Sequence, residues 1–282
     1  MPDRWLVVRG GALGDFILTL PALEALRGLG IAVRLVANPR FAQLRPDLYD
    51  DLVDIQGMAA LPLFDAGPLP WPVDRALVYT PTVAARLSAL GVEVFAGPHR
   101  PPAGTHAQDA LLQPILGLVG EASRRPRLSP TAEALRLIDG RAGAGRVVLA
   151  PGAAAADKRW PGMRALERAL NEAGAGTLWV CPLEEGPPPD LLGPHLSEAP
   201  LALLVALAHR SALWVGNDTG TSHLAAAAGA PTWAFFGPTD PACWLPRGAR
   251  ALPMDMTVDD AAQHVTLALM DLKRAPRAAG RN

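Results

Sequence analysis

The sequence is poor in several features, and each shortage excludes a class of protein. Two cysteines, Cys181 and Cys243, stand far apart among 282 residues, which excludes a disulfide framework and a cysteine zinc site and favours a reducing compartment. No stretch approaches the ~20 consecutive apolar residues that a membrane span needs. The opening residues, MPDRWLVV, run directly into a strand pattern and do not resemble a secretion signal. We therefore expect a cytoplasmic protein with at most peripheral contact with the cytoplasmic membrane.

Charge is scarce as well. Charged residues make up 19% of the chain, the formal net charge is −1, and basic residues gather in the last dozen positions, where a solvated tail explains them. Nucleic acid is therefore not an expected partner. Hydrophobic residues, in contrast, make up 50% of the chain, which is enough for substantial cores. The length is about twice that of a common domain and predicts two domains.

Short apolar runs alternate with longer helix-like segments, a pattern typical of parallel sheets covered by helices. The first half predicts strands at 5–8, 32–36, 52–55, 76–79 and 92–95, helices at 15–29, 82–90 and 106–119, and loops at 61–72, 124–130 and 139–146. The second half predicts strands at 146–152, 177–181, 212–216 and 231–236, and helices at 161–173, 200–209, 221–229 and 258–274. We expect an α/β protein of two Rossmann-like domains, 1–143 and 144–257, facing across a cleft, followed by a C-terminal helix and tail, 258–282.

The first candidate motif is RGGALGDFILTLPAL, residues 9–23, a glycine-rich turn between the first strand and the first helix. A dinucleotide fingerprint needs G-x-G-x-x-G and an acidic residue about 20 residues later. Gly10, Gly11 and Gly14 have the wrong spacing, and the second strand ends at VAN without an acidic residue. A P-loop is excluded because no Gly-Lys-Ser/Thr follows. Hydride transfer with a nicotinamide dinucleotide is therefore disfavoured.

Asp15 ends this turn, and two interpretations of it compete. A carboxylate at a helix start accepts backbone N–H bonds and offsets the helix dipole. Alternatively, Asp15 follows the first strand, where ligands of parallel sheets bind, and can serve as a general base. In the second interpretation Gly11 and Gly14 form an acceptor-side loop, because glycine lets a substrate approach closely.

Two further motifs follow predicted strands in the second half. In GNDTGTSHLAAAAGAPTWAFFGPTDP, residues 216–241, Asp218, Thr219 and Gly220 stand at a strand-to-helix junction and His223 in the first helical turn. Such a helix start suits a diphosphate, although capping alone also explains the polar residues. In APGAAAADKRWPG, residues 150–162, Lys158 either binds an anion or is surface charge beside a helix.

Taken together, the three motifs resemble glycosyltransferase family 9, the ADP-heptose:lipopolysaccharide heptosyltransferases and their relatives, from residue 9 to about residue 246. The resemblance implies a GT-B fold whose C-terminal helix packs back toward the first domain. It also implies an inverting, metal-independent transfer of a heptose or similar sugar from a nucleotide diphosphate donor, such as ADP-heptose, to a glycan or glycolipid acceptor. No cofactor besides this substrate is implied, and the absence of an Asp-x-Asp motif agrees with a site without metal.

The resemblance also implies a role for each matching residue. Asp15 corresponds to the proposed general base, Lys158 to the lysine near the donor phosphates and sugar, and Asp218 to the aspartate that holds the sugar hydroxyls. Thr219 and Gly220 correspond to the backbone positions that bind the diphosphate, with His223 beside them. Glu184 or Glu185 corresponds to the glutamate that holds the ribose.

One alternative from another class stays open, a nucleotide or sugar-nucleotide binding protein without transferase activity. The first-domain loops are short, and Ala153–Ala156 offers no hydroxyl near the expected phosphate, so that binding there must use backbone N–H groups. The presence of Asp15, Lys158 and Asp218 favours the transferase. Ligand-induced stabilisation without turnover would favour the binding protein.

Overall fold

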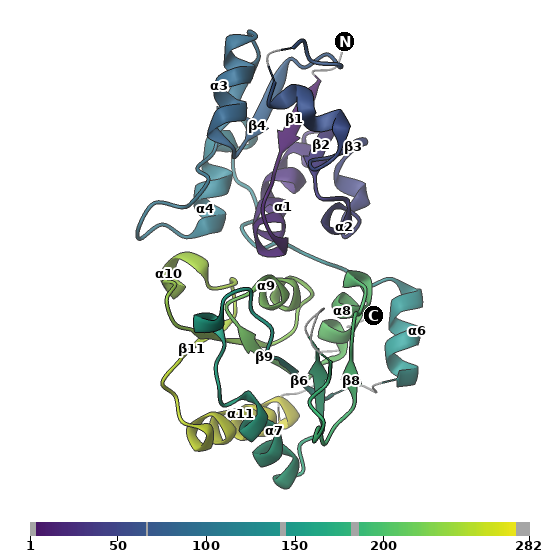
Figure 1. Cartoon of the computed structure of the whole chain (residues 1–282), viewed down its shortest axis with the longest axis vertical. Helices are drawn as coiled ribbons and strands as arrows, with labels where there is room; N and C mark the ends of the chain where they lie inside the picture. Colours follow the sequence, from purple (N-terminus) through teal and green to yellow (C-terminus); the bar gives the residue numbers. More distant parts are fainter. Residues whose placement is uncertain (1–3, 66, 142–144, 182–185, 275–282) are drawn as a thin grey trace. The chain divides into compact units, whose positions relative to one another are not determined.

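The computed structural model describes residues 4–65, 67–141, 145–181 and 186–274. The chain divides into two compact units. Unit 1 comprises Met1–Leu128 and Ala242–Trp244, and unit 2 comprises Ser129–Pro241 and Leu245–Asn282. Each unit is built around its own sheet with helices on both faces (Figure 1).

Unit 1 contains a parallel sheet in the order β3-β2-β1-β4-β5. The strands are β1 (Trp5–Val8), β2 (Val33–Ala37), β3 (Asp51–Asp54), β4 (Arg75–Val78) and β5 (Glu93–Ala96). The helices are α1 (Leu13–Gly28), α2 (Pro39–Ala42), η1 (Pro46–Leu48), η2 (Met58–Leu63), α3 (Pro81–Ala89), α4 (Ala107–Leu112), η3 (Gln113–Ile115) and α5 (Leu116–Val119). All four residues of β1 are buried, because helices cover both faces of a parallel sheet and leave no face for polar residues.

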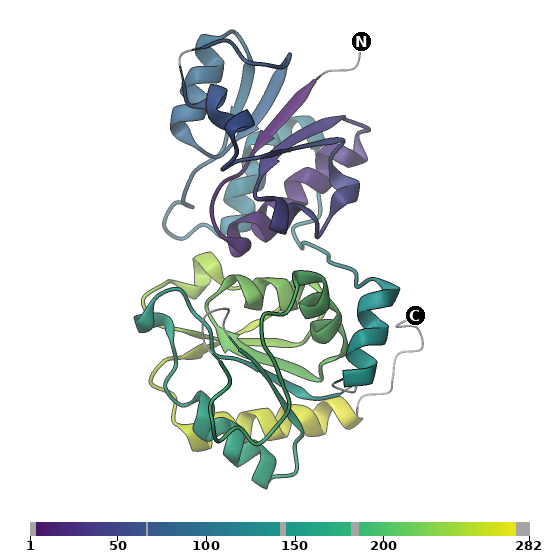
Figure 2. The same ribbon diagram turned by 45° about the vertical axis from the view of Figure 1, so that its right-hand side comes forward.

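Unit 2 contains a second parallel sheet, in the order β11-β10-β9-β6-β7-β8. The strands are β6 (Val147–Ala150), β7 (Thr177–Val180), β8 (His195–Leu196), β9 (Leu213–Asn217), β10 (Thr232–Phe236) and β11 (Arg250–Pro253). The helices are α6 (Ala132–Arg141), η4 (Ala156–Lys158), α7 (Met163–Glu172), α8 (Leu201–Arg210), α9 (Gly220–Ala227) and α11 (Val258–Arg274). The short helix α10 (Pro241–Trp244) interrupts this part of the chain, and its residues Ala242–Trp244 belong to unit 1. Helices α7 and α11 cover one face of the sheet, and α8 and α9 cover the other (Figure 2).

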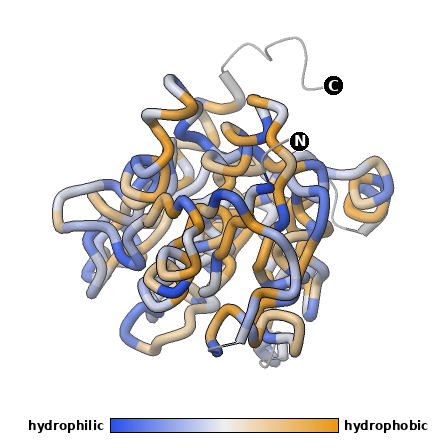
Figure 3. Tube along the Cα trace, turned by 90° about the horizontal axis from the view of Figure 1, so that it is seen from above, coloured by the Kyte–Doolittle hydropathy of each residue, from blue (hydrophilic) through white to orange (hydrophobic). Residues whose placement is uncertain are grey.

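The order of strands fixes where a ligand can bind in each unit. In both sheets the chain order reverses beside a central strand, between β1 and β4 in unit 1 and between β6 and β9 in unit 2. Open α/β sheets bind ligands beyond the carboxyl ends of their strands at such a reversal. The segments that follow β1, β6 and β9 carry the three predicted motifs. Hydrophobic and hydrophilic residues alternate along the chain (Figure 3).

The predicted strands and helices are observed with small shifts of their ends, and the differences have local causes. The helical stretch at 106–119 is divided at Pro114, and η2 extends into the loop predicted at 61–72. Strands β8 and β11 were not predicted, because they are short and carry little hydrophobic pattern.

The observed division of the chain differs from the predicted domain boundary at residue 143. It falls between Leu128 and Ser129, because α6 packs against α8 of unit 2. The sequence predicted loops on both sides of this helix and no helix between them. At the other end of unit 2, α11 packs against α7 and contributes Ala261 and Val265 to the core. The implied contact of this last helix with the first domain stays a prediction.

Candidate functional site

Asp15 lies at the junction of β1 and α1, inside the first helical turn. The helix begins at Leu13, so Asp15 is its third residue, two positions later than a helix over 15–29 would make it. Its Oδ2 accepts the Ala12 N–H at 2.9 Å, which satisfies one of the backbone donors that a helix start leaves unpaired. The structural role considered for Asp15 is therefore present.

The other carboxylate oxygen of Asp15 is held by Arg9, a residue that the sequence did not single out. Arg9 Nη2 donates to Asp15 Oδ1 at 2.9 Å, and Arg9 Nε donates to the Asp15 carbonyl oxygen at 3.2 Å. The Arg9 side chain is 4% exposed and that of Asp15 31% exposed. Burial lowers the pKa of the Arg9 guanidinium from its ordinary value, and the charge of Asp15 opposes this shift.

Gly11 has two structural reasons to be glycine. Its φ is +101°, in the region that other residues adopt only with strain. A Cβ atom there would also lie 2.5 Å from Asp15 Oδ2. Gly11 therefore makes room for the carboxylate itself. The predicted approach of an acceptor at Gly11 and Gly14 stays a prediction.

In unit 2 the sheet brings Lys158 and Asp218 together, although 60 residues separate them. Strands β6 and β9 are neighbours, with Ala150 paired to Gly216, so the segments that follow them lie close together. Lys158 Nζ donates to Asp218 Oδ2 at 2.6 Å. The two side chains are 26% and 8% exposed, respectively. The sequence proposed these residues as separate donor contacts, and the structure adds that they form an ion pair.

Thr239 belongs to the same cluster and was missed as a candidate. Its Oγ1 donates to Asp218 Oδ2 at 2.6 Å, the oxygen that also accepts from Lys158. Within the described residues, Asp218 Oδ1 receives no hydrogen bond. One carboxylate oxygen thus receives two protein donors, and the other receives none from the described residues. Thr239 lies inside the quoted third motif, but nothing in that motif marks its hydroxyl as a partner of Asp218.

The loop that carries Lys158 is fastened to the sheet. Asn217 Nδ2 donates to the Pro151 carbonyl oxygen at 2.7 Å, and Asn217 Oδ1 accepts the Trp160 N–H at 3.1 Å. The Trp160 ring stacks on Phe235 of β10, with centroids 4.0 Å apart. Because both ends of the loop are bonded to β9 or β10, Lys158 is held where the central strands end.

The start of α9 lies directly after Asp218. Thr219 is the N-cap residue, and its side chain makes no capping hydrogen bond to the helix; its Oγ1 lies 2.9 Å from Thr221 Oγ1. Gly220 is the first helical residue, and His223 is buried in the same helix. A helix start whose first N–H groups lack a side-chain cap can accept an anion, as predicted. That the anion is a diphosphate stays a prediction.

Glu184 and Glu185, the candidates for a ribose contact, lie outside the described residues. A cavity of about 190 Å³ lies in unit 2, between the loop after β6 and the described residues that follow β7. It is lined by Pro151, Arg159, Trp160, Pro161, Met163, Arg164, Trp179, Gly186 and Pro188. Both tryptophans are almost fully buried, because Trp160 stacks on Phe235 and the Arg164 guanidinium lies over the Trp179 ring.

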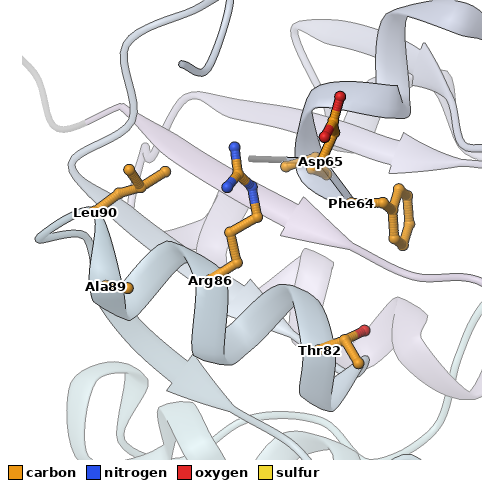
Figure 4. Close-up of a pocket in the computed structure, with 7 residues that line it drawn as sticks. Phe64, Asp65, Thr82, Arg86, Ala89 and Leu90 are labelled. Carbon is orange, nitrogen blue, oxygen red and sulfur yellow. The ribbon is translucent and has the colours of Figure 1, made fainter. Parts of the chain in front are cut away.

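Another cavity, of about 560 Å³, lies in unit 1 between η2 and α3 (Figure 4). It contains none of the predicted site residues. Arg86 extends into it from α3, but its Nε donates to the Pro62 carbonyl oxygen at 2.9 Å and its Nη2 to the Gly67 carbonyl oxygen. The guanidinium therefore fastens the segment after η2 to α3. We assign this cavity no part in the candidate site.

No three or more His, Cys, Asp or Glu side chains among the described residues are grouped so that they could hold a metal ion. None of the described helices combines the length and the apolar composition that crossing a membrane requires.

Two Rossmann-like units, each with polar residues where its strand order reverses, define the GT-B class of glycosyltransferases, and solved structures of this class share the fold. A family model for glycosyltransferase family 9 (heptosyltransferase) matches residues 110–268, and the chain therefore belongs to glycosyltransferase family 9. Membership of this family makes it a glycosyltransferase. The matched range includes Lys158 and Asp218 but begins after Asp15, so it does not bear on the predicted role of Asp15 as a general base.

Similar solved structures extend over both units. A family 9 glycosyltransferase from Veillonella parvula has 18% sequence identity and a TM-score of 0.76, covering 95% of this chain and 97% of that one. The ADP-heptose lps heptosyltransferase II of E. coli has 17% identity and a TM-score of 0.73, covering 96% and 99%. E. coli heptosyltransferase WaaC with ADP has 20% identity and a TM-score of 0.68, covering 94% and 99%. A comparison with curated protein sequences gave no match.

Proposed function

We propose that this glycosyltransferase moves a heptose or a similar sugar from a nucleoside diphosphate donor to a hydroxyl group of a glycan or glycolipid, with inversion and without a metal ion. One observation carries the proposal: Lys158, Asp218 and Thr239 converge beside the start of α9, where the strand order of unit 2 reverses. This arrangement combines a cation, an uncapped helix start and a carboxylate oxygen that no described residue occupies.

Each part of this cluster has a matching part in the donor. The first N–H groups of α9 bind the diphosphate, and Lys158 contributes positive charge beside them. Asp218 Oδ1 accepts hydrogen bonds from sugar hydroxyls, while Lys158 and Thr239 keep Oδ2 in place. The names of solved family relatives support the choice of donor, because WaaC of E. coli was solved with ADP and with ADP-2-deoxy-2-fluoro heptose.

In the proposed reaction, the acceptor hydroxyl oxygen attacks the anomeric carbon opposite the diphosphate and forms the new C–O bond. The bond between that carbon and the diphosphate oxygen breaks, and the nucleoside diphosphate leaves with the electron pair. Asp15 takes the proton of the hydroxyl group. Charge develops on the departing phosphate, where Lys158 and the α9 N–H groups stabilise it. These groups supply the electrostatic stabilisation that a metal ion provides in other transferases.

In this proposal unit 1 supplies the base and unit 2 the donor site. A glycolipid acceptor would require the enzyme to work at the cytoplasmic membrane surface. The acceptor and this location are part of the proposal. The name of a similar solved structure, the E. coli ADP-heptose lps heptosyltransferase II, supports a glycolipid acceptor.

A donor panel tests the proposal directly. The melting temperature is measured with ADP-heptose, ADP-glucose, UDP-glucose, GDP-mannose and NAD, because a ligand that binds only the folded state stabilises it by mass action. Release of free nucleoside diphosphate and transfer to glycan acceptors are then followed by mass spectrometry. We expect ADP-heptose to give the largest stabilisation and to be consumed.

A matched pair of variants shows whether the cluster is the binding site. Asp218→Asn changes a carboxylate of the cluster, and Arg168→Gln removes an exposed arginine of unit 2 that pairs with Asp190. We expect only Asp218→Asn to reduce the stabilisation by ADP-heptose. Stabilisation of the native protein without turnover of any donor would instead favour the non-catalytic binding protein, and stabilisation by NAD alone would contradict both.

A further inference from the structure

We propose that Arg9 is a positioning residue for Asp15: it holds one carboxylate oxygen so that Asp15 presents its remaining lone pairs to the acceptor hydroxyl. This inference rests on the proposed function, because it assigns Arg9 a part in the same reaction. Arg9 belongs to none of the predicted site residues and lies outside the range that the family model matches.

Several hydrogen bonds fix the position of Asp15. Arg9 contacts this residue twice, at the Oδ1 atom and at the carbonyl oxygen, and the Ala12 N–H occupies Oδ2. Thr19 Oγ1 also donates to the Asp15 carbonyl oxygen at 2.9 Å. A carboxylate has about four lone-pair sites, and the protein fills one on each oxygen. The carboxylate is therefore oriented by the chain and still able to accept a proton.

The Arg9 side chain is almost fully buried. A guanidinium that is almost fully removed from water is costly unless an anion and further hydrogen bonds compensate for it. Asp15 is the anion that the described structure gives Arg9, and it is the more exposed member of the pair. The arrangement is directional, because the cation lies beneath and the carboxylate faces outward. In the exposed Arg4–Asp74 pair of the same unit, by contrast, neither side chain is buried, at 49% and 40% exposed.

A buried aromatic ring holds Arg9 in place. Its guanidinium lies 5.1 Å from the centroid of the Tyr79 ring, a cation–π contact. Tyr79 is fully buried, and its hydroxyl donates to the Leu111 carbonyl oxygen at 2.8 Å. Gly97 leaves space for this ring, since a Cβ atom there would overlap it. Arg9 is thus supported by the residue that follows β4, the strand next to β1, and the position of Asp15 depends on this support.

A double-variant cycle tests the inference. Wild type, Arg9→Gln, Asp15→Asn and the double variant are compared for turnover of ADP-heptose, with kcat and the KM for the donor measured separately. Arg9→Gln should lower kcat about 10- to 100-fold, since small displacements of a catalytic group have costs of this order. The KM for ADP-heptose should change less than about twofold, because Arg9 is expected to act on the acceptor side. The double variant should be no slower than Asp15→Asn, because residues that act through one another are not additive.

Three controls keep the result decisive. Arg4→Gln removes the exposed pair with Asp74 and should leave kcat unchanged. Arg9→Lys keeps the positive charge, should recover part of the activity lost in Arg9→Gln, and replaces that variant in the test if it folds poorly. The backbone amide resonance of Ala12 should shift in both variants. In Arg9→Gln the carboxylate loses its bond at Oδ1 and is free to turn away from the Ala12 N–H, which it accepts through Oδ2. In Asp15→Asn an amide group, a weaker acceptor, replaces the carboxylate.

The outcomes separate this inference from the proposed function. If wild type does not turn over ADP-heptose, the proposed function fails, whereas the Ala12 resonance still reports whether Arg9 orients Asp15. An unshifted Ala12 resonance in a folded Arg9→Gln variant overturns the inference. So does a loss of kcat that multiplies with that of Asp15→Asn.

Discussion

The β1–α1 junction of unit 1 and the β9–α9 junction of unit 2 present a carboxylate in two different ways. Asp15 stands inside its helix and receives one protein donor on each oxygen, from Arg9 and from Ala12. Asp218 stands before its helix and receives both donors, from Lys158 and Thr239, on a single oxygen. Both follow a central strand of a parallel sheet, so their surroundings alone distinguish them.

This difference separates two chemical tasks. A carboxylate with one oxygen fully occupied and the other open is suited to hold the hydroxyls of a sugar in a fixed direction. Asp15 lies within its helix, and its own side chain accepts the Ala12 N–H at the helix start. At α9 no side-chain cap occupies the first N–H groups. In the proposed function, the strand-to-helix turn therefore carries a proton acceptor in unit 1 and an anion site in unit 2.

The largest expected effect is that of Asp15→Asn. The amide cannot take the acceptor proton, and loss of a general base typically lowers the rate by about 10²- to 10⁴-fold. The dissociation constant of ADP-heptose, measured by calorimetry, should stay within about twofold, because the donor groups lie in unit 2. Transfer at the wild-type rate by Asp15→Asn would remove the distinction between the two junctions.

Lys158→Met should have the next largest effect, and it should act on donor binding. A hydrogen bond to a charged group is worth ~1.5–3 kcal/mol, which corresponds to about 10- to 100-fold weaker binding of ADP-heptose. The variant also leaves the buried Asp218 carboxylate with one donor fewer, so the melting temperature of the free protein should fall. Lys158→Arg is the control and should recover part of the binding. Equal donor binding by Lys158→Met would contradict the proposed anion site.

The sequence predicted different parts of the two junctions. Lys158 and Asp218 were found because each follows a predicted strand, but their ion pair depends on the adjacency of β6 and β9, which no local pattern encodes. Thr239 has the same limitation. The parallel sheets followed more directly from hydrophobic runs, which are local and strong, whereas the order of their strands was not predicted.

Arg9 shows a second kind of limitation. It occupies the position after β1, where its N–H continues the sheet by donating to the Val36 carbonyl oxygen at 2.9 Å. In the sequence it reads as an ordinary polar residue at a strand end. Its burial depends on Tyr79, 70 residues further along the chain, and on the space left by Gly97. Such a contact is visible only once the sheet is assembled.

Thr239→Val should have a smaller effect than Lys158→Met, at the same junction. The variant removes one of the two donors to Asp218 Oδ2 but leaves the ion pair, so the carboxylate loses direction and keeps its charge partner. A single hydrogen bond contributes ~0.5–1.5 kcal/mol, and the KM for ADP-heptose should rise about 2- to 10-fold. Thr239→Ser retains the hydroxyl and should behave like wild type. A rise of KM in both variants would point to shape and not to the hydrogen bond.

The smallest effect is expected at an ion pair that belongs to neither junction. Arg4 donates to both carboxylate oxygens of Asp74 and lowers the pKa of Asp74 to about 2. Since this pKa lies below the ordinary value of 3.8, the pair stabilises the folded state above about pH 4, and its contribution is lost as the pH falls through about 2. Asp74→Asn should therefore reduce the loss of melting temperature between pH 4 and pH 2. At pH 7 it should leave transfer unchanged, because exposed ion pairs contribute little. A large loss of transfer at pH 7 would show that ion pairing in unit 1 matters generally, and that the Arg9–Asp15 pair is not special in its position.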